Sequence, residues 1–591
     1  MREAPKMSEQ TNQQDAATVP AGQSSSPYEE GWIEQPLYYR GDAPPSGVGK
    51  AEDWVQIPHE GYIPVSKAQV VEQLQPLSGS VAPEQFSHFC ELLEGLYHFY
   101  YHRVLNELKE DYEYFSPTLG SERRIGCSEE DLKRRERRFI LNFILLMIRG
   151  NFNPLQSEEY EQAQAHAFLL DLPVDADWSR HDERLLQEVY AYSETPEGRE
   201  EVQRLLEQSS LKEYLDSPEE CRDNLLIFHR GVTPEKVEGL FLLQKLNIIV
   251  DRILGFLPGL FEKSVDSTIE GTKEAAGRLG SALGIGGDEG DSSASSRDDE
   301  EPQVIFKKRW LRRTSLQNQQ ASFSWLKSKS LLQEPALERV VCLFRFRPPV
   351  PLVNKLPLIS RFMKKAPEVE QDPTIFVKIF KDIPMADMEM VFPEKKLRMR
   401  PFDKAVLTIV ILIAAVMGVI KLNAKGDDFG FLPILITLGL LIFKTVTGFL
   451  RTRMKYIAKM AQELYSKNLD SDTGVLQYLV DSIEEQEFKE SAIAYMLLLN
   501  AGEPLSEEQL DERAEAFISE HFKGLEIDFE VDDALDKLII DETSPASPRD
   551  KRIPLVRVHQ GPEGDLYEAL PLAEALEVMD GKWDQLFDYA G

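Results

Sequence analysis

The chain has 591 residues and a formal net charge of -33, with 42% hydrophobic and 28% charged residues. This is more chain than one hydrophobic core usually needs, and the composition is typical of globular domains rather than of a polytopic transporter. So negative a surface repels nucleic acid and anionic lipid unless basic residues gather locally. The four cysteines are far apart and form no CxxC pair, so neither a disulfide framework nor a zinc site is predicted.

The chain begins with a polar segment and continues into a predicted helical domain. Residues 1–27 are rich in Gln, Ser and Ala, which predicts a disordered tail. We expect residues 28–283 to form an N-terminal, mostly helical domain. Its clearest helices run over Pro83–Leu108 and Glu129–Arg149, where apolar residues recur three and four positions apart. Leu225–Gly231 has the pattern of a short strand ended by glycine.

Two motifs in this domain have residue types that could bind a metal ion or a phosphate. Glu94, His98 and His102 lie four residues apart, so a helix would place them on one face, where two histidines can hold a metal. No further ligand is evident, so partly buried histidines on an amphipathic helix are the favoured interpretation. The glycine-rich run from Gly277 lacks the lysine and hydroxyl residue of a phosphate-binding loop. No catalytic residue, cofactor site or metal site is therefore predicted.

The middle of the chain changes character twice. Residues 284–302 are rich in Gly, Ser, Asp and Glu, which predicts a flexible acidic insert. Residues 303–396 open with the basic stretch Lys307–Lys329, for which a contact with anionic lipid headgroups and a plain basic surface remain equal alternatives. Arg339–Phe346 and Thr374–Phe380 have the pattern of paired strands.

A short segment before residue 397 is predicted to form a rigid collar. Pro384 and Pro393 bracket a stretch that can form one amphipathic turn or helix, with Asp387 and Glu389 between methionines. Together with Asp382, these residues form a possible functional site, although a purely structural role is the favoured interpretation.

Residues 397–454 contain two apolar runs, Ala405–Ile420 and Phe429–Thr447. A membrane-spanning helix needs about 20 apolar residues, and lysines at the ends of a shorter run can extend it. We therefore expect a two-helix transmembrane hairpin. Basic residues cluster before the first run and after the second, which places both termini on the cytoplasmic side or in an organelle matrix. The predicted location is a bacterial inner membrane, with an organelle inner membrane as the alternative.

Residues 455–591 are predicted to form a helical C-terminal domain. Several helices precede a hairpin over Leu555–Leu570, which is the order of a winged helix. The helix in the reading position carries Asp532, Asp533 and Asp536, whereas phosphate contact needs positive charge. We therefore expect protein contact rather than specific nucleic-acid binding.

Four blocks of the sequence resemble a known family. They are Lys378–Lys396, which contains the collar; Tyr101-His-Arg; Glu485–Tyr495; and Met579–Tyr589. These blocks are similar to the membrane family called domain of unknown function 3754. The resemblance implies a shared architecture but no reaction, because none is established for that family.

The predicted fold class is mainly α with small α/β parts: an N-terminal helical domain, a transmembrane hairpin and a C-terminal winged-helix-like domain. The leading hypothesis is a non-enzymatic, membrane-anchored interaction or scaffold protein with unknown protein partners. An enzyme with a site near the collar is one alternative, which a deep pocket lined by Asp387, Glu389 and a histidine would favour. A membrane-bound nucleic-acid regulator is the other, which a basic face on the C-terminal domain would favour.

Overall fold

The computed structural model describes residues 38–40, 53–57, 60–79, 82–155, 159–160, 174–176, 225–249 without 243 and 247, 309–316, 323–347, 372–392, 395–397, 409, 416, 431–522, 525, 527–541, 547, 549–561 and 564–586. The predicted tail over residues 1–27 and the predicted insert over residues 284–302 lie outside this part of the chain. The domain boundaries proposed from the sequence stay predictions.

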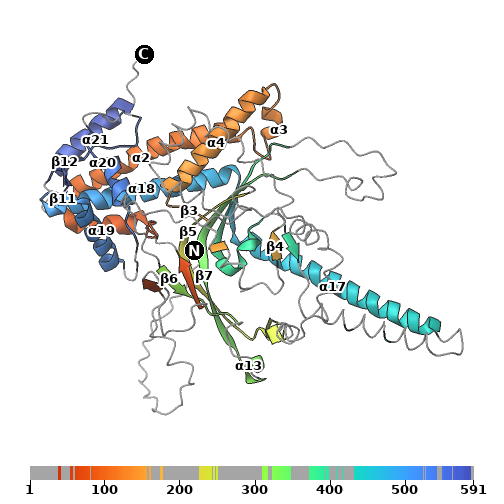
Figure 1. The fold of residues 1–591 in the computed structure, drawn as a ribbon. Coiled ribbons are helices and arrows are strands. Elements are labelled where there is room, and N and C mark those ends of the chain that lie inside the picture. The colour runs from red at the N-terminus through yellow and green to blue at the C-terminus, as the bar shows by residue number, and fades with distance from the viewer. Residues whose placement is uncertain are drawn as a thin grey trace, which may run out of the picture.

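A five-stranded antiparallel sheet lies at the centre of the molecule (Figure 1). Its order is β10-β8-β7-β5-β3, and every neighbouring pair is antiparallel. The strands are β3 (Asn153–Pro154), β5 (Leu225–Gly239), β7 (Ser330–Phe344), β8 (Phe376–Pro384) and β10 (Asn468–Ser471). The predicted pairing of the strands near residues 339–346 and 374–380 is confirmed by β7 and β8.

Both faces of this sheet are buried. Successive side chains of a strand point to opposite faces, so neighbouring residues belong to different cores. Phe228, Val341 and Ile379 belong to the larger core, which also contains the apolar residues of the main helices. Ile227 and Val340, one position away, belong to a second core on the other face.

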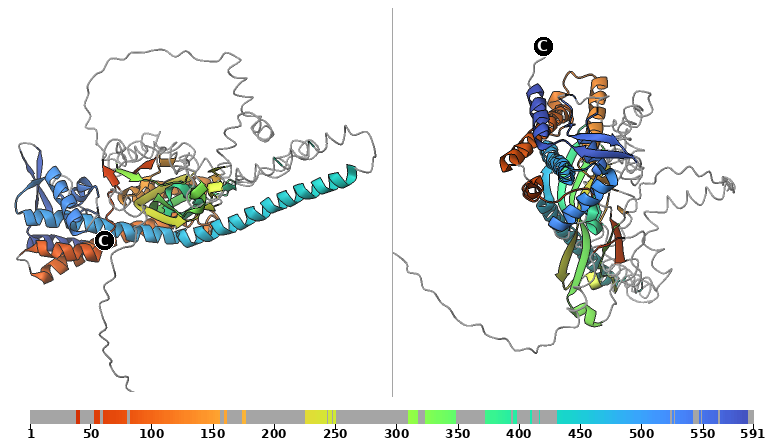
Figure 2. Two further views of the ribbon diagram at one scale, coloured as in Figure 1. Left: turned by 90° about the horizontal axis from the view of Figure 1, so that it is seen from below. Right: turned by 90° about the vertical axis from the view of Figure 1, so that its left-hand side faces the viewer.

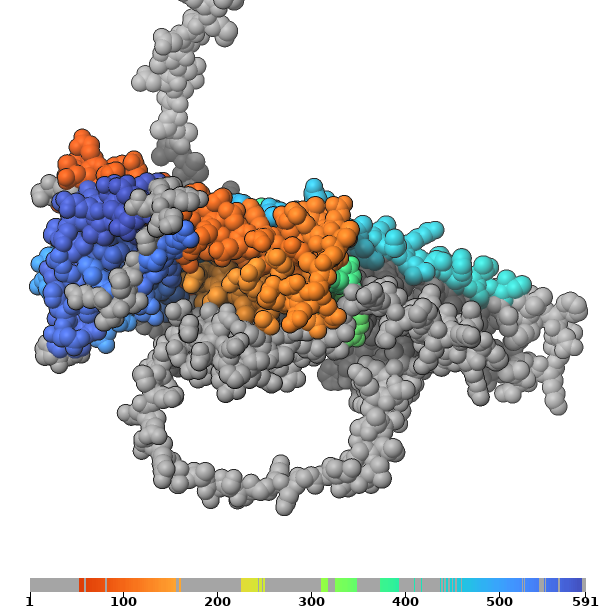
Figure 3. Space-filling model, turned by 90° about the horizontal axis from the view of Figure 1, so that it is seen from above, coloured from red at the N-terminus to blue at the C-terminus, as the bar shows by residue number. Residues whose placement is uncertain are grey.

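Three long helices build the larger core. They are α2 (Pro83–Tyr112), α4 (Glu129–Arg149) and α18 (Thr473–Ala501). The predicted helix over Glu129–Arg149 is confirmed, with Ser128 as its N-cap, and the helix from Pro83 continues four residues beyond the predicted Leu108. Figure 3 shows a face of the molecule on which α2 and α4 (orange) adjoin the C-terminal residues (blue).

The second core is covered by a small sheet and a short helix. The small sheet has the order β1-β6-β2, formed by Tyr38–Arg40, Arg309–Arg312 and Trp54–Ile57. The short helix is the 3-10 helix η5 (Met385–Met390), which follows β8 directly. The smaller elements are α1 (Lys67–Leu74), η2 (Gln75–Ser78), α3 (Gly120–Arg123), β4 (Val174–Ala176) paired with β9 (Lys395–Leu397), and α13 (Phe323–Lys327).

The C-terminal unit has the element order of a winged helix. After α18 come β11 (Leu505–Ser506), α19 (Glu507–His521), α20 (Val531–Leu538), β12 (Val556–Gln560), β13 (Asp565–Ala569) and α21 (Leu572–Leu586). β12 and β13 form the predicted hairpin, and β11 adds to it in the order β11-β13-β12. Figure 2 shows this unit packed against α2.

Helix α17 (Phe431–Lys467) leads out of the molecule and back to α18, and Figures 1 and 2 show it extending away from the other elements. Within the described part of the chain, no helix is both long enough and apolar enough to cross a membrane. The prediction of a transmembrane hairpin, and with it of a two-span membrane location, is wrong on this finding. Lys444 interrupts the apolar part of α17, and Arg451, Arg453 and Lys455 follow it.

The other predicted span, Ala405–Ile420, lies outside the described residues except for Ile409 and Val416, which are both about half exposed. The fold prediction also missed the central sheet, because it ended the strand from Leu225 at Gly231. Gly231 has a φ of +75°, yet pairing resumes at once with Val232 opposite Leu337.

Candidate functional site: a buried charge network on helix α18

Helix α18 carries a run of buried polar residues in its middle, interrupted by Phe488. Gln486, Glu487, Lys489, Glu490 and Ser491 are each at most 2% exposed. Burying such groups is costly unless each finds a hydrogen-bond or charge partner. The run therefore identifies the place where the surrounding elements must supply partners.

A single ammonium group lies at the centre of the network. Lys537 of α20 is fully buried, and its Nζ lies 2.5 Å from Glu487 Oε2, 2.7 Å from Glu490 Oε2 and 2.6 Å from Asp533 Oδ2. The Tyr101 hydroxyl of α2 donates to the other oxygen of Glu487. The ammonium thus joins α18 to α20, and the tyrosine joins α18 to α2.

The second oxygen of Glu490 is also occupied. Gln486 Nε2 donates to Glu490 Oε1 over 2.7 Å, and Asn151 Nδ2 donates to the same atom over 3.1 Å. Asn151 follows α4 and has a φ of +54°, a conformation that asparagine tolerates better than most residues. The network therefore also reaches the end of α4.

The pKa values of the network follow from burial and charge. Burial alone would lower the pKa of Lys537, but Asp533, Glu487 and Glu490 outweigh it and raise that pKa well above its ordinary value. Burial raises the pKa of Glu490. For Asp533, burial is outweighed by Lys537 and Lys551, which hold its pKa below the ordinary range. Lys537 therefore stays charged at every physiological pH.

The three carboxylates have the spacing of a cation site. Oxygen atoms of Glu487, Glu490 and Asp533 lie within 4.8 Å of one another, and among the described residues they form the group that could hold a metal ion. Three carboxylates suit a hard divalent cation. The Lys537 ammonium occupies the middle of this group, so the protein supplies the positive charge from its own chain.

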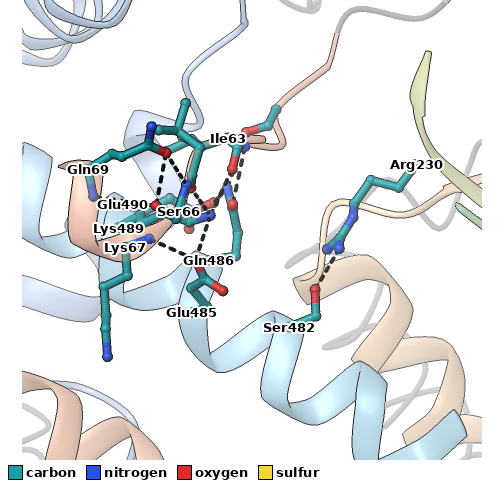
Figure 4. Close-up of polar contacts among 12 residues, drawn as sticks. Ile63, Ser66, Lys67, Gln69, Arg230, Ser482, Glu485, Gln486, Lys489 and Glu490 are labelled. Carbon is teal, nitrogen blue, oxygen red and sulfur yellow. Dashed lines mark hydrogen bonds and ion pairs between the residues drawn. The ribbon is translucent and has the colours of Figure 1, made fainter. Parts of the chain in front are cut away.

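An extended segment of the N-terminal region, residues 61–67, lies across α18, and we call it the strap (Figure 4). Gln486 Oε1 accepts from the Ile63 N–H over 3.2 Å, and its Nε2 donates to the Gly61 carbonyl over 3.3 Å. Lys489 Nζ donates to the carbonyls of Ile63 (2.7 Å) and Val65 (3.0 Å). Burial lowers the pKa of Lys489 to about 8. The hydrogen bonds that Gln486 and Lys489 make to the strap therefore all go to its backbone.

The strap ends where helix α1 begins. The Lys67 N–H donates to Glu485 Oε1 over 2.8 Å. Ser66 is the N-cap of α1 and forms a capping box with Gln69, which satisfies two backbone N–H groups of the first turn. The cap fixes the direction in which α1 leaves α18.

A buried arginine ties the central sheet to the same helix. The Arg230 guanidinium lies 3.8 Å from the centre of the Tyr62 ring and 4.3 Å from that of Phe152. Its Nη1 donates to the Gly150 carbonyl over 2.8 Å, and its Nη2 donates to Ser482 Oγ over 2.6 Å (Figure 4). Stacking on aromatic faces and two hydrogen bonds together stabilise a charge that would be costly to bury alone.

A groove opens to solvent beside the strap. Its volume is about 340 Å³, and its lining includes Lys67, Glu94, Asp481, Glu484 and Phe488. Glu94 was one of the three residues weighed as metal ligands from the sequence. The second of them, His98, contacts Glu484 of the groove through Nδ1 over 3.0 Å and stacks on His102 with ring centres 5.8 Å apart.

The structure places the collar against the second core. Pro384 is the N-cap of η5, Asp387 is 3% exposed, and Asp382 has a φ of +51° and accepts from Lys467 through its carbonyl. Pro393 lies outside the described residues. Any functional role of the collar stays a prediction.

A buried ion pair next to the collar was not predicted from the sequence. Glu334 on β7 forms a buried double hydrogen bond with Arg313, at 2.7 and 2.6 Å, and accepts from the Ala386 N–H over 2.9 Å. Burial raises the pKa of Glu334 to about 7, against the opposing effect of Arg313. This ion pair also shows that Arg313, within the basic stretch Lys307–Lys329, is used inside the protein. Contact of the rest of that stretch with anionic headgroups stays a prediction.

Sequence reasoning missed the centre of the network. The sequence pattern was used only to interpret Asp532 and Asp533 as charges that disfavour phosphate contact, and it gave no role to Lys537. A usable signal was present, since Asp533 and Lys537 are four residues apart on one helix and Glu487 and Glu490 are three apart on another.

The fold and the network define a class: an α+β protein in which an antiparallel sheet, long helices and a winged-helix-like unit share one core. Residues 337–474 match the model of a family described as "Protein of unknown function (DUF3754)", so this part of the chain is similar to that family. The match runs from within β7 to the first turn of α18, so it ends before the buried network begins. No curated protein and no solved structure matches the chain.

Proposed function

We propose that this chain is a non-enzymatic interaction protein that holds protein partners on a rigid, acidic body. The observation that carries the proposal is the orientation of α20, the helix in the reading position of the winged helix. It turns Lys537 inward to the carboxylates of α18 and presents Asp532 and Asp536 to solvent. A surface that binds nucleic acid must do the opposite, because it has to neutralise phosphates.

The wing supports the same conclusion. Arg557 on β12 is paired with Glu574 over 2.6 Å, and His559 is paired with Glu568 over 2.7 Å. Side chains that are already paired with carboxylates gain little from a phosphate. The outward faces of α20 and of the wing thus favour a partner that carries positive charge.

Rigidity supports a holding role. The network fixes α18 to α2, α20 and the strap through buried, charge-assisted contacts, which are about twice as strong as neutral hydrogen bonds. A binding surface built on such a frame loses little entropy when a partner binds.

Two titrations of the full chain test this proposal. Labelled duplex DNA in 0.15 M salt should show no anisotropy change below about 1 µM, where specific binders saturate. Selection of a random peptide library on the immobilised chain should enrich peptides with an excess of Lys and Arg. Sub-micromolar DNA binding that discriminates between sequences would replace this proposal with the nucleic-acid regulator, and a library without enrichment would contradict an interaction role.

A further inference from the structure

We infer that the groove beside the strap binds one cationic side chain, arginine or lysine, of a protein partner. This inference rests on the proposed function and names the chemistry of its partner. It goes further because it assigns the contact to one place, the groove between the start of α1, the middle of α2 and the first half of α18.

The groove already holds a cation of the chain itself. The Lys67 ammonium bonds to Glu94 and lies 5.7 Å from the centre of the Phe488 ring. An ammonium over an aromatic face and beside a carboxylate is the arrangement by which proteins recognise cationic side chains. The lining is therefore built for positive charge and not merely acidic.

More negative charge lines the groove than Lys67 can neutralise. Glu484, Glu485 and Asp481 also line it. The partner of Glu484 is the exposed His98, and Asp481 accepts from the neutral Gln477 amide over 2.8 Å. Glu485 accepts from the Lys67 backbone N–H and lies 3.7 Å from the Lys489 ammonium, so two ammonium groups face the four carboxylates of the lining. Burial raises the pKa of Glu484, and a further cation beside this carboxylate would lower that pKa again.

Size and spacing select the kind of cation. A volume of about 340 Å³ lies at the lower end of the range for small-molecule sites, so it admits one side chain and not a folded element. A metal ion needs several donor atoms close together, and among the described residues that spacing occurs at Glu487, Glu490 and Asp533 instead. A guanidinium or ammonium on a flexible stem meets carboxylates that are further apart.

The test uses the full chain and a pair of labelled nonapeptides that differ at the central residue, arginine in one and citrulline in the other. Citrulline keeps the shape of the side chain and removes its charge. Fluorescence anisotropy at low salt should show about tenfold weaker binding of the citrulline peptide, because a charge-assisted hydrogen bond is lost. Equal binding of the two peptides would overturn the inference.

Variants locate the contact. Asp481→Asn with Glu484→Gln should weaken binding of the arginine peptide about tenfold, whereas the charge-matched control Glu512→Gln with Glu520→Gln, on the exposed face of α19, should change it less than twofold. Lys67→Met removes the resident ammonium and should strengthen binding severalfold. This gain keeps the inference testable even where an acid substitution impairs folding.

The outcomes separate this inference from the proposed function. Binding that responds equally to the groove variant and to the control variant would place the contact elsewhere on the acidic surface, so the groove assignment would fail while the interaction role remained. Loss of library enrichment, by contrast, would remove the interaction role itself.

Discussion

Replacing Lys537 by methionine should be among the most damaging single changes in the chain. Methionine keeps most of the volume and the apolar stem but removes the ammonium, which leaves the carboxylates of Glu487, Glu490 and Asp533 facing one another at 0–29% side-chain exposure. Removing one partner of a buried ion pair costs about 3–5 kcal/mol. Against a total stability of about 5–15 kcal/mol, such a loss corresponds to about a thousandfold change in the folding equilibrium.

Guanidinium chloride denaturation of the full chain, followed by far-ultraviolet circular dichroism, measures this loss. A matched control is Lys133→Met, because Lys133 is half exposed and its 3.6 Å contact with Glu129 is a surface pair worth about 0.3–0.5 kcal/mol. The variant should also regain stability as the pH falls toward 5. Without the ammonium, the crowded carboxylates bind protons more tightly in the folded state than in the unfolded state.

A second substitution checks the cause. Adding Glu487→Gln and Glu490→Gln to Lys537→Met removes most of the unpaired charge and should recover the greater part of the loss. A cost below about 1 kcal/mol for Lys537→Met, or a loss that neither lower pH nor the added glutamines reduce, would show that the network does not act through charge.

Three further predictions concern packing, pH and thiol chemistry. Gly150→Ala should lower the free energy of unfolding by about 1–3 kcal/mol in a denaturant titration, because a Cβ there would lie 2.7 Å from a buried isoleucine of α18, whereas Gly581→Ala, with open space around its Cβ, should be neutral or stabilising. Stability should rise between pH 8 and 9.5 through Lys489, whose pKa is about 8 when folded and 10.5 when unfolded, so that the unfolded chain binds more protons; urea midpoints that rise as steeply in Lys489→Met would contradict this. Iodoacetamide at pH 8 should label Cys127 well before Cys90, which is buried and whose pKa burial raises to about 12, and mass spectrometry of the digested protein would show the reverse order if this reasoning fails.

Local patterns in the sequence predicted several elements well. The helix over Glu129–Arg149 has a serine cap, three acids in its first turn and an apolar stripe, and the structure gives it the same bounds. The hairpin of β12 and β13 has a turn with glycines at both ends and was also found. These signals lie within about twenty residues of chain, so no distant partner is needed to read them.

The central sheet could not be read in the same way. β5 continues past Gly231 because β7, about a hundred residues later, pairs with it as far as Ser330. Pro234 lies opposite Pro335 in this pairing, and a proline inside a strand ordinarily argues against a strand. The long-range partner overrides the local signal.

The membrane prediction failed for a related reason. The length of an apolar run is a local property of the sequence, and it led to the prediction of a membrane span in the region before Lys444. No described helix is both long enough and apolar enough to cross a membrane. The charge network needed tertiary information as well. Lys537 and Glu490 are 47 positions apart, and nothing in either segment alone indicates that their side chains meet.

Helix α17 has a mechanical consequence. Its 37 residues at about 1.5 Å each give an arm about 55 Å long, so a tilt of one degree at Lys467 moves the far end by about 1 Å. At that inner end, Lys467 bonds to the Asp382 carbonyl, and Asn468 pairs with Phe380 on β8. Helix α17 is thus connected at its inner end to the edge of the central sheet and, through β10, to the first turn of α18. A force on the outer end of α17 would therefore act on the sheet edge and on α18 as a torque, without direct contact with either element.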